Sequence, residues 1–293
     1  MEHSWFGSML VCETYCLGQS YRDLLGQVIS CGDPVEPRGL KTREARPLVL
    51  QLQSPYHCIV RRPGFNQAYM WMEIAQYLAG DFDRELLARY SPRAAEMNNA
   101  YGSYGPRIGE QLLDVERELK RDGDSRRGMV YVGRPEDLRY AKDLDMVCTV
   151  GWHFQRRKNL LEMTVFMRSW DLVWGLSYDI PAFVSVQLAL ARALDLDPGS
   201  YTHVASSGHV YERHWDLATR VETTSATLPC VGSHTGMDDT RKAARYLLAW
   251  EREVPFGGVF KTDAAAEEPL RTWRPALEVW SAFGEHKNNN ATN

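Results

Sequence analysis

The sequence predicts an α+β fold, because long helical patterns and paired strand patterns are mixed along one chain of 293 residues. Residues 64–81, GFNQAYMWMEIAQYLAGD, are typical of an apolar helix that ends at Gly80. Residues 145–155 and 160–169 flank the polar turn RRKN and predict a β-hairpin. Residues 181–196, PAFVSVQLALARALDL, are apolar on nearly every face, which predicts a central buried helix that starts at its proline.

The remaining elements follow from similar local signals. In chain order, we expect a helix near 16–29, an exposed loop over 31–44, a strand within 47–55, helices around 83–98 and 107–121, a strand after Gly128 that stops at Pro135, and a strand near 201–206. No linker composition interrupts the chain, so residues 1–293 are treated as one domain. The polar tail at 285–293 is expected to be disordered.

Composition excludes several classes of protein. Hydrophobic residues make up 44% and charged residues 25% of the chain, as in an ordinary globular protein. A net charge of −4 lacks the basic footprint of a general nucleic-acid binder. The six cysteines show no paired CxxC spacing, which argues against a disulfide framework or a zinc ribbon, and we expect no metal. The N-terminus has no long apolar run, so we expect a cytoplasmic protein that does not contact a membrane.

Cys148 is a candidate nucleophile. It lies on one arm of the predicted hairpin and Arg168 lies on the other, so that a guanidinium could favour the thiolate form. The alternative for a cysteine in a strand is a buried side chain that packs as a small hydrophobe.

Two further features allow both a functional and a structural interpretation. Glu73 lies in the middle of the apolar helix, where burial would raise the pKa of its carboxyl and suit it to proton transfer, unless it is exposed along one stripe of the helix. Arg126 and Arg127 offer paired guanidinium groups to a phosphate monoester, unless they are solvated side chains at the start of a strand.

Together with their neighbours, these residues resemble the thymidylate synthase family and, within it, the cytidylate hydroxymethylases of bacteriophages and nucleoside-antibiotic pathways. The motifs that carry the resemblance are SRR at 125–127, Cys148 followed by His153-Phe154, MRSWD at 167–171, Gly175, Asp179 and HVYERH at 209–214. Upstream, EIAQYLAGD at 73–81 and AYGSYG at 100–105 resemble the glutamate helix and the Tyr-Gly segment of the family. The resemblance covers roughly residues 35–216.

The resemblance implies the thymidylate synthase fold, a mixed β-sheet with surrounding helices whose sheet packs at a homodimer interface. It also implies 5,10-methylenetetrahydrofolate as co-substrate and a pyrimidine nucleoside monophosphate whose C6 is attacked by Cys148. The other implied roles are phosphate binding by Arg168, Ser169 and Arg38, phosphate binding across the dimer by Arg126 and Arg127, proton transfer at C5 by Glu73, sugar binding by His209 and Tyr211, and cofactor binding by Asp171, Gly175 and Tyr101.

Asp179 stands where thymidylate synthases place an Asn against uracil. A carboxylate only accepts hydrogen bonds, which suits the amino group of cytosine and a protonated N3, whereas O4 of uracil would face a second acceptor. The alternative role of Asp179 is the N-cap of the following helix. The chain also ends in KNNNATN instead of an apolar closing segment, which fits trapping of the exocyclic methylene by water instead of hydride.

The sequence therefore predicts a CMP or dCMP 5-hydroxymethylase, with CMP favoured by the resemblance. One alternative is a thymidylate synthase or a uridylate hydroxymethylase. Another is a catalytically silent relative that binds nucleotides or RNA, against which the intact Cys148, Glu73 and Arg168 argue.

Overall fold

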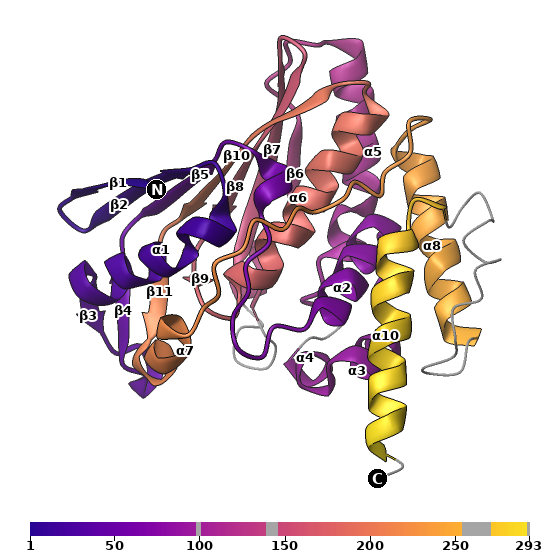
Figure 1. Cartoon of the computed structure of the whole chain (residues 1–293). Coiled ribbons are helices and arrows are strands. Elements are labelled where there is room, and N and C mark those ends of the chain that lie inside the picture. Colours follow the sequence, from indigo (N-terminus) through magenta and orange to yellow (C-terminus); the bar gives the residue numbers. More distant parts are fainter. Residues whose placement is uncertain (98–100, 139–145, 254–270, 292–293) are drawn as a thin grey trace.

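A seven-stranded mixed sheet forms the centre of the computed structural model, which describes residues 1–97, 101–138, 146–253 and 271–291 (Figure 1). In spatial order its strands are β1 (Glu2–Phe6), β2 (Met9–Thr14), β5 (Leu48–Leu52), β10 (Asp197–Ala205), β8 (Leu160–Met167), β7 (Thr149–Arg157) and β6 (Met129–Tyr131). The pairs β2–β5 and β8–β10 are parallel, and the other neighbours are antiparallel. The predicted α+β class with a mixed sheet is confirmed.

A smaller four-stranded sheet lies below the first in Figure 1 and has the order β3 (Asp33–Val35), β4 (Thr42–Ala45), β11 (Gly208–Tyr211) and β9 (Trp170–Asp171). The sequence predicted only a loop over 31–44, which was wrong for β3 and β4. These strands are short and polar, and β4 gains its ladder by pairing with β11 from the far end of the chain. A pattern of adjacent residues carries no sign of that partner.

The long helices gather on one face of the large sheet (Figure 1). The helices of the chain that the structure describes in full are α1 (Leu17–Cys31), α2 (Gln67–Ala79), α3 (Arg84–Tyr90), α4 (Pro92–Met97), α5 (Gly105–Arg121), α6 (Leu176–Ala193), α7 (Trp215–Thr219), α8 (Met237–Glu253) and α10 (Arg274–Ala291). Helix α6 contacts β8 and β10, while α2 packs against α6 on one side and against α8 on another. Helix α2 is therefore held inside the helical layer.

Helix α2 has local signals at both ends. The Asn66 side chain accepts a hydrogen bond from the backbone N–H of Tyr69 at 3.0 Å and caps the first turn. Gly80 has a φ of 62° and ends the helix in the left-handed conformation, as predicted. Glycine is also required there because an added Cβ would lie 2.9 Å from the Cα of Gly109. The ends of α2 thus fix the position of Glu73 in the middle of the helix.

Helix α6 begins earlier than predicted, at Leu176 instead of Pro181. Pro181 therefore lies inside the helix, in its second turn, where it has no N–H to donate to the carbonyl of Ser177. Burial of the apolar side chains ahead of Pro181 extends the helix, since Leu176 and Ile180 have 0% exposure. The N-cap is Gly175, so the alternative role of Asp179 as N-cap is wrong; Asp179 lies inside the first turn.

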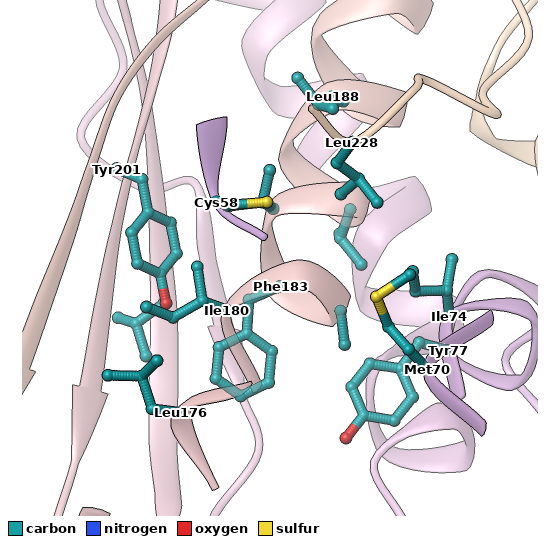
Figure 2. Close-up of a cluster of buried hydrophobic side chains, with 14 of the residues drawn as sticks. Cys58, Met70, Ile74, Tyr77, Leu176, Ile180, Phe183, Leu188, Tyr201 and Leu228 are labelled. Atoms are coloured by element: carbon teal, nitrogen blue, oxygen red, sulfur yellow. The ribbon is translucent and has the colours of Figure 1, made fainter. Parts of the chain in front are cut away.

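The core between the large sheet and the helices is shown in Figure 2. Side chains of α6, among them Ile180 and Phe183, lie between Tyr201 of β10 and the apolar side of α2, which presents Met70 and Ile74 (Figure 2). All five of these residues are buried, and this packing holds α2 and α6 together.

The C-terminal helix α10 packs on α2, and the indole N–H of Trp280 donates to the carbonyl of Ala68 at 2.9 Å. This helix is described as far as Ala291, and the disorder expected of the tail at 285–293 stays a prediction. Adding turns to an existing helix is much easier than starting one, which explains how a polar segment can follow a packed one. Residues 292–293 lie outside the described part of the chain, as does residue 98 at the end of the helix predicted over 83–98.

Within the described residues, no helix is long and apolar enough to cross a membrane.

Candidate active site

A cavity of about 430 Å³ opens between α2, the start of α6 and the residues that precede β7. Five of the residues selected from the sequence lie on its wall: Glu73, Cys148, Asp171, Gly175 and Asp179. They come from three separate parts of the chain, and the contact between α2 and α6 brings together the two parts that carry Glu73 and Asp179. A nucleophile and three carboxyl groups therefore share one concave site.

Cys148 stands one residue before β7, and Arg168 stands one residue after β8. The predicted hairpin is confirmed, and the backbone N–H of Arg168 donates to the carbonyl of Cys148 at 2.9 Å. The Arg168 guanidinium donates to the carbonyls of Val147 at 3.1 Å and Met146 at 2.8 Å. Arg168 thus braces the backbone that carries the cysteine, although its own side chain is exposed and is not on the cavity wall.

Glu73 reaches the cavity from α2. The hydroxyl groups of Tyr69 and Tyr77 both donate to its Oε1, at 3.2 and 3.4 Å. Its Oε2 is buried and has no hydrogen-bond partner among the described residues. Burial raises the pKa of Glu73 to about 7, and the two tyrosine hydrogen bonds oppose part of that rise. A carboxyl with this pKa can both release and accept a proton near neutral pH.

Asp179 faces the cavity from the first turn of α6. Its Oδ2 accepts a hydrogen bond from the indole Nε1 of Trp170 at 3.1 Å. Burial is the main reason that its pKa lies well above the usual range, and the charge of Glu73 raises it further. Both effects favour the protonated, neutral form of Asp179. Gly175 leaves space for it, because a Cβ there would lie 3.0 Å from Oδ2.

Tyr104, which the sequence analysis did not select, lies on the cavity wall. Its hydroxyl accepts a hydrogen bond from the backbone N–H of Thr149 at 3.2 Å, and burial together with the proximity of Cys148 raises its pKa. Tyr101, which was selected, instead lies over the guanidinium of Arg107 at 5.0 Å and is not on the wall. The segment AYGSYG contains two Tyr-Gly pairs, and only the start of α5 at the second pair could have distinguished them.

An aromatic region adjoins Asp171. Asp171 Oδ1 accepts hydrogen bonds from the backbone N–H groups of Val173 at 2.8 Å and Trp174 at 3.1 Å, which fixes the turn before α6. The Trp174 indole donates to His214 Nε2 at 3.3 Å, and burial lowers the pKa of this histidine. On the ring of Trp174, the guanidinium of Arg62 lies 3.8 Å from the centroid. Trp174 and Arg62 belong to no motif quoted from the sequence, and His214 ends the motif HVYERH but was given no role there.

The remaining predicted site residues do not line this cavity. His209 and Tyr211 on β11 meet edge to face at 5.0 Å, and Tyr211 reaches the wall through His214, with ring centroids 5.7 Å apart. The others lie outside the cavity and are half-buried or exposed: Ser169, Arg38, Arg126 and Arg127. The single chain therefore brings together the groups proposed for chemistry and leaves apart those proposed for phosphate binding.

Comparison with known proteins agrees with this arrangement. Residues 66–238 match the thymidylate synthase family. The deoxyuridylate hydroxymethyltransferase of Bacillus phage SP01 is 28% identical over 220 residues, which is 66% of this chain and 56% of that protein. The bifunctional dihydrofolate reductase-thymidylate synthase of Zea mays is 28% identical over 41% of this chain and 23% of its own length. That of Daucus carota is 29% identical over 48% of this chain and 25% of its own length. The matches thus span little more than half of the phage relative and about a quarter of the plant relatives. Because the family match covers more than half of the chain and includes the cavity residues on α2 and α6, the chain belongs to the thymidylate synthase family.

Proposed function

We propose that this protein is a cytidylate 5-hydroxymethylase that converts CMP or dCMP, with methylenetetrahydrofolate and water, to 5-hydroxymethylcytidylate and tetrahydrofolate. The observation that carries the proposal is the position of Asp179 on the same cavity wall as Cys148 and Glu73. An acidic residue at this point presents a different hydrogen-bonding pattern to the base than an Asn does. CMP is the substrate that the resemblance favours.

In this proposal the Cys148 thiolate forms a bond to C6 of the pyrimidine. The displaced electron pair of the C5–C6 double bond moves through C4 to N3, which must gain a proton. Asp179, neutral because burial raises its pKa, supplies that proton and becomes a carboxylate that accepts a hydrogen bond from N3–H. The neutral acid is a refinement of the ionised carboxylate assumed from the sequence. Carbon C5 then carries the nucleophilic electron pair.

Glu73 is the proposed proton carrier at C5. With a pKa of about 7, its carboxylate can take the proton that C5 loses after its new bond has formed. Its Oε2, buried and without a partner among the described residues, is suited to hold the water that adds to the exocyclic methylene. Tyr69 and Tyr77 hold Oε1, so that the free oxygen keeps its direction.

Methylenetetrahydrofolate supplies the one-carbon unit in this reaction. Asp171, Gly175 and the Trp174 ring fit its binding, because they place a carboxylate and a flat apolar surface on one part of the cavity wall. Asp171 uses Oδ1 for two backbone N–H groups, and its second oxygen is suited to accept a hydrogen bond from an N–H edge of the pterin.

Phosphate and sugar binding are proposed for the residues outside the cavity. Arg168, Ser169 and Arg38 would bind the phosphate from the same chain, while His209 and Tyr211 would bind the sugar. Arg126 and Arg127 are exposed ahead of β6, and we propose that they complete the site of a second copy in a homodimer. Support for a dimer comes from Tyr131, Val150 and Phe166, exposed apolar residues on β6, β7 and β8, with exposures of 63%, 52% and 38%.

A second candidate is a uridylate hydroxymethylase or a thymidylate synthase. The observation that favours it is the similarity to the SP01 protein, which is named for deoxyuridylate. A neutral Asp179 could also pair with uracil if its proton lay on the oxygen opposite O4. The base therefore has to be decided by experiment.

The test measures release of tritium from CMP, dCMP, UMP and dUMP labelled at C5, each with methylenetetrahydrofolate, together with the mass of the product. We expect release from a cytidylate, a product heavier by a hydroxymethyl group, and no release by Cys148→Ala. Release from uridylates alone would assign the protein to the second candidate. Absence of release from all four nucleotides would favour a silent relative.

A further inference from the structure

Trp170 touches the reactive carboxyl of the site without lining the cavity. It lies on β9 with 1% exposure, and its Nε1–H donates to Oδ2 of Asp179 at 3.1 Å. Strand β9 pairs with β11, and the backbone N–H of Trp170 donates to the carbonyl of Ser207 at 2.8 Å. The backbone that presents the indole is therefore held on the small sheet, independently of α6.

The indole ring is also fixed by stacking. The ring of His203 lies parallel to it, with an interplanar angle of 8° and centroids 3.7 Å apart. His203 has 0% exposure, and its Nδ1 lies 2.8 Å from the Tyr201 hydroxyl. Burial lowers the pKa of His203 to about 3, so the stacked ring is neutral. Trp170 cannot turn its N–H away from Asp179 without breaking this stack.

The hydrogen bond distinguishes the two oxygens of Asp179. A carbonyl oxygen accepts a hydrogen bond better than the hydroxyl oxygen of an acid, so the indole favours the form with the proton on Oδ1. Oδ2 is also enclosed on the side of Gly175, where even a Cβ would come within 3.0 Å. In the neutral acid, Oδ2 is then the acceptor and Oδ1–H the donor.

We propose that the indole N–H of Trp170 fixes the proton of Asp179 on Oδ1 and thereby makes the site select cytosine over uracil. This rests on the proposed function and adds to it the residue that sets the choice of base. In the proposed pose, the base lies with its exocyclic group toward Oδ2 and its N3 toward Oδ1–H. Cytosine then matches at both points, since its amino group donates and its N3 accepts. Uracil fails at both, because O4 meets an acceptor and N3–H meets a donor. The opposite proton position would reverse this preference.

The test compares Trp170→Phe with Trp152→Phe. Phenylalanine at 170 keeps an aromatic ring against His203 and removes the donor together with part of the buried ring volume, a loss of volume that Trp152→Phe shares. Trp152 is a matched control because it has 0% exposure, packs on Phe183 at 5.0 Å and has an indole Nε1 with no partner among the described residues. For each protein, kcat/KM for tritium release is measured with the CMP and UMP pair and the dCMP and dUMP pair.

We expect the ratio of kcat/KM for the cytidylate to kcat/KM for the uridylate to fall roughly 10-fold or more in Trp170→Phe, because cytidylate turnover slows and uridylate turnover rises. In Trp152→Phe the same ratio should stay within about twofold of wild type. A general packing defect would lower both rates and leave the ratio unchanged, which would overturn the role of Trp170. If the wild-type protein prefers cytosine and Trp170→Phe keeps that preference, this inference is refuted and the proposed function stands. A wild-type preference for uracil refutes both this inference and the proposed function.

Binding gives a second readout that does not depend on turnover. Calorimetric titration of CMP and UMP into Cys148→Ala, and into the same protein with Trp170→Phe, measures recognition of the base without the covalent step. Loss of the CMP preference on removal of the indole N–H is expected. Equal CMP preference in the two proteins would contradict the inference even if no catalysis were found.

Discussion

The carboxyl groups of Glu73 and Asp179 lie on one cavity wall, and the charge of Glu73 contributes to the raised pKa of Asp179. Burial is the larger cause for both groups. When Glu73 is ionised, its charge therefore favours the neutral form of Asp179. Through this effect a base and an acid can be present in the site at the same pH.

The raised pKa of Glu73 predicts a pH-dependent cost to stability. Its pKa is about 7 in the folded protein against a usual 4.5, so the folded state binds the proton more tightly than the unfolded state. Stability is then fully present below the unfolded pKa and falls as the pH rises through 7. We expect Glu73→Gln to be more stable than wild type by roughly 2–3 kcal/mol at pH 8 and by much less at pH 4.5. Urea denaturation at both pH values measures this, and parallel stability curves for the two proteins would contradict it.

The tyrosines around Glu73 are expected to set the pH at which the enzyme works. Tyr69 and Tyr77 donate to Oε1 and lower the pKa of Glu73, so Tyr69→Phe or Tyr77→Phe should raise that pKa further. The acidic limb of the kcat/KM profile for tritium release should move up by roughly half a pH unit to one unit for each lost hydrogen bond.

Tyr90→Phe is the matched control for these variants. Tyr90 is also buried, and its hydroxyl donates to a buried glutamate, Glu251, at 2.6 Å. Because this pair is not on the cavity wall, the same loss should leave the profile unchanged. An unshifted limb in both site variants would show that these hydroxyls do not act on the titrating group.

Gly175 is expected to tolerate no side chain. A Cβ there would lie 2.8 Å from the carbonyl oxygen of Asp171 and 3.0 Å from Oδ2 of Asp179. Since the first of these is a backbone atom, the start of α6 must shift, and we expect Gly175→Ala to lower tritium release by at least about 10-fold.

Gly26→Ala tests whether any Gly-to-Ala change is harmful. Gly26 is exposed in α1, and nothing lies within 4 Å of the added Cβ. Alanine there should raise the free energy of unfolding by roughly 0.5–1 kcal/mol and leave activity unchanged. Full activity of Gly175→Ala would disprove the steric argument.

The buried pair of Arg107 and Asp137 is expected to stabilise the segment that carries Tyr104. The two side chains are each 2% exposed and form two hydrogen bonds, at 2.7 and 2.9 Å, and the guanidinium lowers the pKa of Asp137 to about 2. Arg107 also donates to the carbonyl of Tyr101 at 3.0 and 2.7 Å.

Asp137→Ala should therefore cost about 3–5 kcal/mol of unfolding free energy, because it leaves a buried guanidinium without its counter-charge. The control is Asp114→Ala, which removes the surface pair with Arg117, where both side chains are about 70% exposed, and should cost less than about 0.5 kcal/mol. Denaturation of the two variants under one condition compares them directly. Similar costs for both would show that burial does not strengthen the first pair.

Much of the fold could be predicted because its signals are local. Helix α2 has its apolar period, its Asn cap and its terminal Gly80 within adjacent residues, and the β7–β8 hairpin has alternation around a polar turn. The strands β3 and β4 and the start of α6 could not be predicted in the same way. Pairing with β11 and burial of Leu176 determine them, and both depend on distant parts of the chain.

For the site, the sequence alone determined which groups are available: a cysteine beside a hairpin, a glutamate inside an apolar helix, and an aspartate in the place of an asparagine. Only the tertiary structure decided that Tyr104 and not Tyr101 faces the cavity, that burial favours the neutral form of Asp179, and that Trp170 donates to one of its oxygens. The reason is physical. A residue type fixes which hydrogen bonds a side chain can make, whereas its pKa and the direction of its donors depend on the neighbours that burial places around it.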